Sequence, residues 1–486
     1  MKNSILKSIL VPLAFSAVGT PVHSQEKMNV LFIAADDMNN DLGCLGNSLV
    51  KSPNIDRLAS KGVLFSNAYC QFPLCSPSRS SIMTGLRPDS TKVFDLEYHF
   101  RQGLPDVVTL PQMFINNGYY VARVGKMFHY GNPDDVGTNG LDDKVSWMER
   151  INPAGLDKTS LEPDVINYTP SRPGLGASMA YYSDKKGTDA EHTDGKVVEE
   201  TIKLLKKHKD KPFFIAAGFY RPHCPWIAPS KYFDLYHLDQ ISLPPIGPQT
   251  RNEYPEQALA STKPWPYMGL NSQQARECKL AYYASISFVD AQVGILLDAI
   301  KSLGLSENTI VVFWSDHGYQ LGEHGLWLKR SLFEEACKCP LIFTVPGKIS
   351  GGKICRHKVE LVDIYPTLAE LTGLKPPANL QGYSLSPLLQ HPDAEWKHPA
   401  FTQVQREKIP GHSIRTDEWR YTEWDYGKMG KELYNELNDP QELHNLAADS
   451  KYADVMMKLK DLLHKEHPRT ITGGKAVADT KSRYTN

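Results

Sequence analysis

Four mostly apolar runs, each followed by charged or polar residues, constrain the fold of this chain more than any other feature. They cover residues 28–35, 119–124, 213–219 and 309–315. Such runs are typical of strands buried on both faces of a parallel sheet. Residues 193–208, 275–303 and 359–372 predict helices that cover this sheet, and apolar residues recur at helical spacing in 275–303. The pattern therefore predicts an α/β fold with a large mixed, mostly parallel sheet sandwiched by helices.

The residues that follow two of these runs carry carboxylates. Asp36 and Asp37 come after the first run, and Asp316 and His317 come after the fourth. Ligands of open α/β sheets gather at the carboxyl ends of the strands. Adjacent carboxylates repel each other unless a cation lies between them, and oxygen-rich sites suit Ca²⁺ or Mg²⁺ better than zinc. We therefore predict a site for Ca²⁺, or alternatively Mg²⁺, although two consecutive aspartates also fit a solvated turn.

A further stretch, Cys75-Ser76-Pro77-Ser78-Arg79, predicts the start of a helix. Pro77 fits the first helical turn and Ser76 can cap it, which would leave Cys75 just outside the N-terminus. Backbone N–H groups at such an end favour an anion. Taken alone, the pattern also fits an ordinary buried cysteine before a surface helix, because free cysteine packs as a small apolar side chain.

The longer string from Cys75 through Arg79 to Thr84-Gly85 resembles the signature of the type I sulfatases, members of the alkaline phosphatase superfamily. The resemblance implies that Cys75 is oxidised to formylglycine (3-oxoalanine) by a formylglycine-generating or anaerobic sulfatase-maturating enzyme. It also implies that Arg79 holds the modified residue and that residue 75 is itself a ligand of the cation. The implied fold is alkaline phosphatase-like, with a smaller C-terminal antiparallel sheet.

Within that family the chain resembles the iduronate-2-sulfatase branch, in the strings 125–129 (GKMFH), 221–223 (RPH) and 316–329. The resemblance implies that four more side chains contact the modified cysteine or the sulfate: Lys126, His129, His223 and Lys329. His223 is then the candidate acid for the leaving alcohol. Outside this resemblance, Lys126, His129 and His223 also fit solvated loop residues. Tyr319 stands where that branch has tryptophan, so the substrate contacts are expected to differ.

The formal net charge of the chain is -1, with acidic and basic residues interspersed. No polybasic run is present, so we predict neither a nucleic-acid partner nor binding to anionic lipid. Two lysines within residues 1–7, the largely apolar residues 8–22 and a small residue before Gln25 predict a signal peptide over 1–24. The apolar run is too short for a transmembrane segment. We therefore expect a periplasmic or secreted protein, with a disordered or membrane-anchoring N-terminus as the alternative.

The hydrophobic pattern becomes short and alternating from about residue 399, which predicts a change of architecture there. We therefore predict a catalytic domain over 25–397 and a C-terminal subdomain with a small antiparallel sheet and a helix over 398–486. Eight cysteines are too few for a disulfide scaffold in a chain of 486 residues. Cys337 and Cys339 fit two buried thiols better than a strained pair.

The resemblance implies a secreted sulfatase that hydrolyses sulfate esters of a sulfated polysaccharide or its oligosaccharides. The candidate substrates are a 2-sulfated uronic acid of the iduronate type and an algal polysaccharide such as ulvan. One alternative is a phosphatase or phosphonate hydrolase of the same superfamily, which would share the cation site. The other is a non-catalytic protein that binds sulfated glycans and whose Cys75 is never modified.

Overall fold

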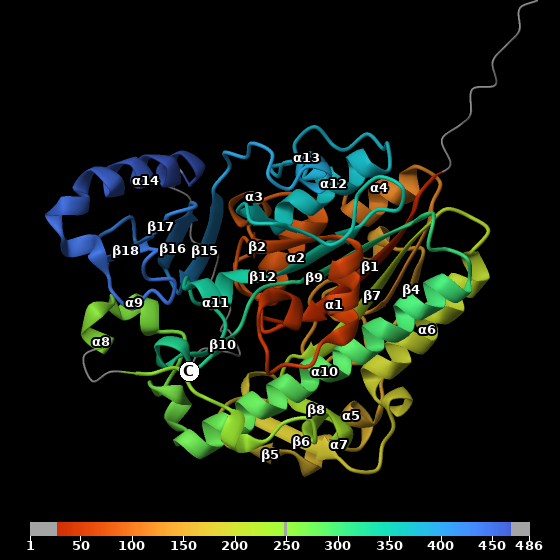
Figure 1. Cartoon of the computed structure of the whole chain (residues 1–486), viewed down its shortest axis with the longest axis horizontal. Helices are drawn as coiled ribbons and strands as arrows, with labels where there is room; N and C mark the ends of the chain where they lie inside the picture. The colour runs from red at the N-terminus through yellow and green to blue at the C-terminus, as the bar shows by residue number, and fades with distance from the viewer. Residues whose placement is uncertain (1–26, 247–249, 468–486) are drawn as a thin grey trace, which may run out of the picture.

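A nine-stranded mixed sheet forms the centre of the computed structural model, which describes residues 27–246 and 250–467 (Figure 1). Its strands lie in the order β13-β2-β12-β9-β1-β7-β3-β4, and β14 pairs with β2. Neighbouring strands are parallel except at β12 (Lys338–Thr344), which runs antiparallel to both β2 (Val63–Tyr69) and β9 (Thr309–Ser315). The predicted α/β fold with a mixed, mostly parallel sheet is confirmed.

The four apolar runs form four adjacent strands of this sheet, in the order β9-β1-β7-β3. Besides β9, these strands are β1 (Asn29–Asp36), β7 (Phe213–Pro222) and β3 (Tyr120–Gly125). Because all four are parallel, their carboxyl ends lie at the same edge of the sheet. The polar residues that follow each run are therefore carried to one place.

Side chains of β1 alternate between two separate hydrophobic cores. Leu31 and Ile33 pack with residues of α6 (Thr193–His208) and α10 (Ser272–Ser302), whereas Val30 and Phe32 pack with residues of α4 (Leu110–Asn116) and α12 (Ile364–Leu371). Successive side chains of a strand point to opposite faces, so helices cover both faces of the sheet (Figure 1). By length and composition α10 could span a membrane, but 78% of its most apolar window is buried.

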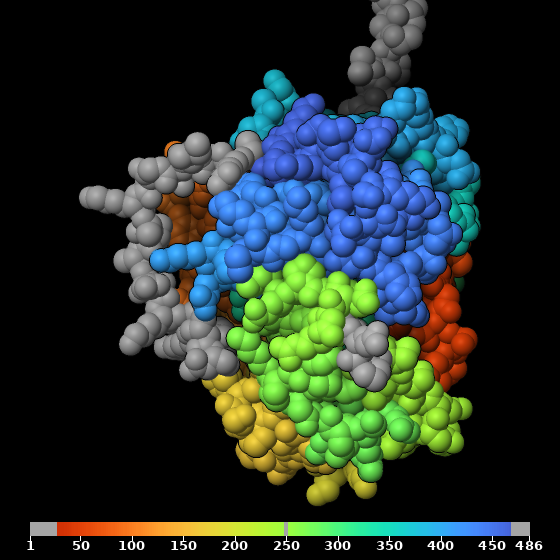
Figure 2. Space-filling view, turned by 90° about the vertical axis from the view of Figure 1, so that its left-hand side faces the viewer, coloured from red at the N-terminus to blue at the C-terminus, as the bar shows by residue number. Residues whose placement is uncertain are grey.

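A separate four-stranded antiparallel sheet follows near the C-terminus. It consists of β15 (Ala400–Arg406), β16 (Ile409–Arg415), β17 (Trp419–Trp424) and β18 (Lys431–Asn435), paired in sequence order. The helix α14 (Ala453–Glu466) packs on it through Leu459 and Leu463. Figure 2 shows this region, in blue, seated on the green segments of the main domain. The predicted small C-terminal antiparallel sheet and packing helix are confirmed.

One predicted helix is wrong in part. Residues 359–372 were expected to form a single helix, but β14 (Val359–Glu360) pairs with β2 and α12 begins only at Ile364. The Glu360 carboxylate accepts hydrogen bonds from Arg87 at 2.7 and 2.5 Å, which holds this segment extended beside the sheet. Tertiary contacts here override the helical pattern of the sequence.

The described residues of 131–187 and 233–269 form only short helices and strands.

Apart from 3-10 helices, the remaining helices and strands of the described residues are α1 (Pro53–Lys61), α2 (Cys75–Thr84), α3 (Pro88–Thr91), β4 (Glu149–Ile151), α5 (Leu156–Thr159), β5 (Ile166–Asn167), β6 (Ala180–Asp184), β8 (Trp226–Pro229), α7 (Ser230–Phe233), α8 (Thr250–Glu253), α9 (Glu256–Leu259), β10 (Gln320–Leu321), β11 (Trp327–Leu328), α11 (Glu334–Cys337), β13 (Lys353–Cys355) and α13 (Ser386–Gln390).

All eight cysteines lie among the described residues and all are free thiols, as expected for a chain without a disulfide scaffold. Cys337 and Cys339 are both buried, as predicted. The signal peptide predicted over 1–24 lies outside the described residues, as does the chain end beyond residue 467. The signal peptide and the two domain boundaries remain predictions.

Candidate active site

The chain leaves β1 through a strained backbone position at the edge of the sheet. Asp37 follows the strand with a φ of 64°, which is uncommon for a residue other than glycine, although aspartate tolerates it. Its backbone N–H donates to Asp316 Oδ1 at 3.1 Å, and the next N–H, of Met38, donates to Ser315 Oγ at 2.9 Å. These bonds tie the end of β1 to the end of β9.

The helix α2 begins at Cys75, with Leu74 as its N-cap residue. The prediction that Ser76 caps this helix and leaves Cys75 outside it is therefore wrong. Ser78 N–H donates to the Leu74 carbonyl at 3.1 Å and the Ser78 hydroxyl donates to the Asp316 carbonyl. Contacts with the strand edge thus fix the first turn without a side-chain cap, and Cys75 occupies the first helical position.

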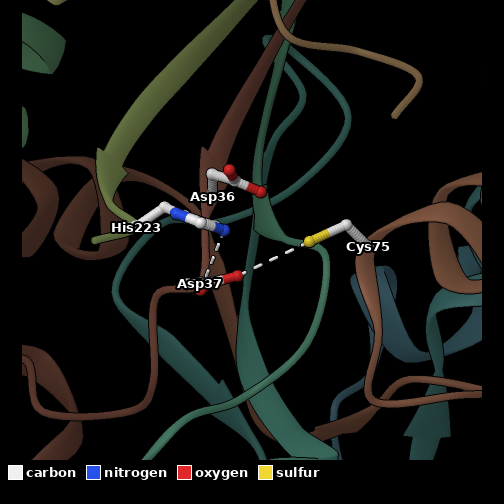
Figure 3. Close-up of side chains that lie close together, drawn as sticks. All are labelled: Asp36, Asp37, Cys75 and His223. Carbon is white, nitrogen blue, oxygen red and sulfur yellow. Dashed lines mark hydrogen bonds and ion pairs between the residues drawn. The ribbon is translucent and has the colours of Figure 1, made fainter. Parts of the chain in front are cut away.

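The Cys75 thiol is enclosed by side chains from three other segments. Its Sγ lies 3.3 Å from Lys329 Nζ, 3.5 Å from His317 Nε2 and 3.6 Å from Asp37 Oδ1. Figure 3 shows Cys75 and His223 pointing toward Asp37 from opposite sides. Burial alone would raise the pKa of the Cys75 thiol, but the charges of Lys329 and Lys126 together outweigh it and lower that pKa. The position therefore favours a negatively charged group.

Arg79 is fully buried, and each of its three guanidinium nitrogens donates to a protein group. Its Nη2 lies 3.0 Å from Asp36 Oδ1 and its Nε lies 2.9 Å from Asp316 Oδ2. Its Nη1 donates to the carbonyls of Lys126 and Met127 at 3.0 and 3.1 Å. The structure thus places Arg79 against the carboxylates, and no hydrogen bond between described residues joins it to Cys75.

Asp36, the last residue of β1, and Asp37, which follows it, each contact a lysine. Lys126 Nζ lies 2.6 Å from Asp36 Oδ2, and Lys329 Nζ lies 2.5 and 2.7 Å from the two carboxylate oxygens of Asp37. Burial would raise the pKa of Asp36, but Lys126 and Arg79 hold it well below its usual range. Burial dominates at Asp37 and raises the pKa of that carboxyl. The pKa values of the two carboxyl groups are therefore shifted in opposite directions.

Two predicted histidines differ in how closely they join this cluster. His223 Nε2 lies 3.6 Å from Asp37 Oδ2, while its Nδ1 lies 2.6 Å from the Cys224 carbonyl oxygen. His129 is buried nearby, and its Nδ1 has no hydrogen-bond partner among the described residues. Burial and the charge of Lys126 hold the pKa of His129 well below its usual range. His129 is therefore a neutral imidazole beside the cluster rather than part of its contact network.

The residues predicted to hold a cation converge. His317 Nε2 lies 3.3 Å from Asp37 Oδ1 and 3.6 Å from Asp316 Oδ2, and one ligand atom each of Asp37, Cys75, Asp316 and His317 lie within 4.8 Å of one another. Burial opposes protonation of His317, yet the negative groups around it raise its pKa to about 9. This environment favours positive charge. Asp36 belongs to a second such group, with Asp37, Cys75 and His223. The carboxylates of Asp37 and Asp316 and the His317 imidazole, with residue 75, therefore fit a hard divalent cation, and Asp36 adjoins them.

Tyr282 of α10 is fully buried, and its hydroxyl supports the site. It donates to the Asp37 carbonyl at 2.7 Å and accepts from Asn39 N–H at 2.8 Å. The signal in the sequence was the tyrosine itself, because a hydroxyl buried within an apolar helix needs a partner. Tyr319 stacks on Tyr282 with ring centroids 5.0 Å apart.

Comparisons with known proteins agree with this geometry. The family model described as Sulfatase matches residues 28–374, and the model described as N-sulphoglucosamine sulphohydrolase, C-terminal, matches residues 322–469. A sulfatase of Formosa agariphila is 35% identical over 95% of this chain and 89% of its own length. Iduronate 2-sulfatase of Mus musculus is 32% identical over 94% of this chain and 97% of its own length.

A solved structure, a putative sulfatase from Bacteroides thetaiotaomicron, superposes with a TM-score of 0.72 at 25% identity and covers 94% of this chain and 96% of its own. The family model spans well over half of the chain, and two relatives exceed 30% identity across almost all of it. This chain therefore belongs to the sulfatase family of the alkaline phosphatase superfamily, and it is a sulfuric ester hydrolase.

Proposed function

We propose that this protein removes sulfate from sulfated polysaccharides or their oligosaccharides, with Cys75 converted to formylglycine and Ca²⁺, or alternatively Mg²⁺, as cation. The ligands of the cation would be Asp36, Asp37, Asp316, His317 and residue 75 itself. The observation that carries the proposal is the position of Cys75 Sγ, within 3.6 Å of Lys329, His317 and Asp37. Formylglycine and the cation would supply a hydrated aldehyde as nucleophile and a Lewis acid.

The charged side chains would hold and neutralise the sulfuryl group. Arg79 fixes Asp36 and Asp316 in place, so the site needs little rearrangement when substrate binds. Lys126 and Lys329 each end in a compact ammonium group at this edge of the sheet. Both are placed to stabilise negative charge on the sulfate oxygens.

The histidines would move the protons. The 2.6 Å contact with the Cys224 carbonyl requires hydrogen on His223 Nδ1, so Nε2 is the atom that faces Asp37 and the leaving alcohol. Burial lowers the pKa of His223 to about 3, so Nε2 carries no proton near neutral pH in the free protein. To act as the acid, His223 would need the negative charge of the bound sulfate to raise that pKa. His129, a neutral imidazole, and Asp37 are the candidate bases.

Two relatives, from Mus musculus and Homo sapiens, are iduronate 2-sulfatases and align with 94% of this chain. We therefore propose a 2-sulfated uronic acid as the first candidate substrate and an algal polysaccharide such as ulvan as the second. The proposal includes export by the signal peptide predicted over 1–24 to the periplasm or the exterior. It also includes a maturation enzyme that oxidises Cys75.

The test is expression together with a maturation enzyme, followed by assays on 4-nitrophenyl sulfate and 4-nitrophenyl phosphate. We expect sulfate hydrolysis that disappears in Cys75→Ala, and a lower mass for the peptide that contains residue 75. Chelation should abolish the activity and Ca²⁺ should restore it. Full activity of C75A, or faster hydrolysis of the phosphate, would refute the proposal. Binding of sulfated oligosaccharides without hydrolysis would support the glycan-binding alternative.

A further inference from the structure

Two arginines beside the candidate active site have no acidic partner in the part of the chain that the structure describes. Arg330 directly follows Lys329, and Arg406 is the last residue of β15 in the C-terminal sheet. The Arg406 side chain donates to the Arg330 carbonyl, and its guanidinium lies over the Trp424 ring at 5.6 Å. Arg330 Nη2 lies 3.4 Å from the Gln405 carbonyl oxygen. The Nε atoms of both arginines are buried without a hydrogen-bond partner in the described part of the chain.

This absence of a carboxylate sets Arg406 apart from the other buried arginines. Among the described residues, six further arginines are buried, and each forms an ion pair with a carboxylate: Arg79, Arg87, Arg123, Arg221, Arg415 and Arg420. Arg406 is only 8% exposed and forms no such pair. An unpaired buried charge is costly, so this protein keeps an unbalanced cation where its other buried arginines are balanced.

Among the described residues, no acid forms an ion pair with Arg330 or Arg406. The charge of Asp95 acts on Arg330, but Asp95 is exposed and forms no ion pair with it. One carboxylate oxygen of Asp95 already accepts from the N–H groups of Glu97 and Tyr98 at 2.9 and 2.8 Å. Burial and the charge of Arg330 lower the pKa of Arg406 to about 9. The pair therefore has an excess of positive charge.

The pair lies close to the catalytic centre. Arg330 N–H donates to the Pro73 carbonyl at 3.0 Å, and Pro73 precedes Cys75 by two residues, a span of at most about 7 Å. Leu328 and Arg330 have φ values of 70° and 68°, so the backbone on both sides of Lys329 is strained. Such strain outside glycine concentrates at functional sites. The backbone is thus held so that Lys329 reaches Cys75 while Arg330 meets the C-terminal sheet.

We propose that Arg330 and Arg406 bind a second anionic group of the substrate, a sugar carboxylate or a second sulfate, while the sulfate to be cleaved lies at residue 75. This inference rests on the proposed function and narrows its substrate class to sulfated sugars that carry another acid. Guanidinium groups suit it because they bind carboxylate and sulfate oxygens through two parallel hydrogen bonds. The pair would also give the C-terminal sheet a part in substrate choice.

The test compares the mature wild type with Arg330→Gln, Arg406→Gln and the double variant. Three substrates are used: 4-nitrophenyl sulfate, a 2-sulfated uronic acid and a disulfated neutral monosaccharide. We expect each single variant to lower the ratio of kcat/KM for the doubly anionic substrate over that for 4-nitrophenyl sulfate by about tenfold, mainly through KM. The double variant should lose little more, because both arginines hold the same group. Arg406→Lys should restore part of the ratio.

The two doubly anionic substrates distinguish a carboxylate from a sulfate as the second group, and a fall with either one supports the proposal. The matched control is Arg57→Gln, an exposed arginine paired with Asp298, for which the ratio should not change. Unchanged ratios in the arginine variants, or a loss of stability in urea with equal losses on all substrates, would overturn the inference. Failure of the mature wild type to hydrolyse 4-nitrophenyl sulfate would instead refute the proposed function.

Discussion

At the scale of single residues, Arg79 organises the site through the carboxylates that it holds. Its guanidinium bridges Asp36 on β1 and Asp316 after β9, and it also fixes two carbonyls after β3. A planar group with five donors can serve four acceptors at once, which lysine cannot do. One side chain of α2 thus holds together the ends of three strands.

Arg79→Lys should therefore damage both folding and activity. The variant keeps the charge but loses most of the hydrogen bonds, leaving two buried carboxylates poorly paired, at a cost of about 3–5 kcal/mol. Urea unfolding measures this loss, and 4-nitrophenyl sulfate reports the accompanying loss of activity. Arg57→Lys, at an exposed ion pair with Asp298, is the control and should cost less than about 1 kcal/mol. Equal unfolding midpoints for the two variants would contradict this view of Arg79.

The buried carboxyl of Glu432 should make the unfolding free energy depend on pH. It is buried between Trp424 Nε1 at 2.8 Å and the Tyr434 hydroxyl at 2.9 Å, and burial raises its pKa from 4.5 to about 7. Between these two pH values the folded state binds more protons than the unfolded state, so the stabilisation is complete below about 4.5 and is lost as the pH rises to about 7. Each unit of pKa corresponds to about 1.4 kcal/mol, so the change amounts to about 3 kcal/mol.

Glu432→Gln should remove this dependence. The difference in unfolding free energy between wild type and variant should change by about 3 kcal/mol between pH 4.5 and 7, as measured by urea titrations across that range. The control is Glu418→Gln, an exposed glutamate at the neighbouring turn between β16 and β17. If the difference in unfolding free energy between wild type and E432Q stayed constant across this pH range, Glu432 would have the same pKa in the folded and unfolded states, which would contradict the prediction.

At the scale of elements, the end of β3 depends on the close approach of two backbones. A Cβ on Gly125 would lie 2.2 Å from the Gly218 carbonyl oxygen of β7, and Gly125 itself has a φ of 73°. Glycine is the residue that meets both conditions without strain. The next residue is Lys126, whose ammonium group contacts Asp36. The spacing of the two strands therefore sets the position of a charged side chain in the site.

Gly125→Ala should lower kcat for 4-nitrophenyl sulfate by about 100-fold, because a backbone shift of about 1 Å would misplace Lys126. The matched control is Gly304→Ala, at a φ of 72° with no atom within 4 Å of the added Cβ. Both variants carry the cost of a left-handed alanine, about 1–2 kcal/mol in the unfolding free energy. Only G125A should also lose activity. Equal activity in the two variants would mean that the strand contact does not position Lys126.

At the scale of the whole molecule, a buried ionic network joins the C-terminal sheet to the main domain. Glu334 of α11 accepts from the Tyr69 hydroxyl of β2 at 2.8 Å and forms ion pairs with Arg415 and Arg420 of the small sheet. Burial would raise the pKa of Glu334, but the charges of Lys338 and both arginines hold it well below its usual range. The position of the C-terminal sheet against the main domain depends on the Glu334 carboxylate, and so does the position of Arg406.

Glu334→Gln should destabilise the protein by about 3–5 kcal/mol, because it removes the charge that balances buried arginines. Urea unfolding followed by tryptophan fluorescence measures the change, since Trp424 lies in the C-terminal sheet. Glu395→Gln removes an exposed ion pair with Lys397 and should leave the unfolding midpoint in place. A midpoint for E334Q equal to that of E395Q would exclude the network as a link between the two sheets.

The sequence alone determined the four central strands and the residues at their ends. Mostly apolar runs of this length indicate strands covered on both faces, and parallel strands end at one edge of a sheet. The sequence therefore predicted that Asp36, Lys126, His223 and Asp316 lie at one edge. The motif around Cys75 indicated the family because all its residues lie within one short stretch of sequence. The long helix α10 and the small C-terminal sheet also follow from periodicity, which is a property of short windows.

The tertiary structure decided what depends on contacts between distant segments. The start of α2 at Cys75, the extended Glu360 and the support that Tyr282 gives to Asp37 all result from partners far away in the chain. The lack of an acidic partner for Arg330 and Arg406 among the described residues likewise depends on which segments meet. A hydrogen bond or an unbalanced charge is a relation between positions, and a single sequence does not record which positions meet. The sequence could therefore predict the family and the residue types of the site, whereas the contacts between those residues required the fold.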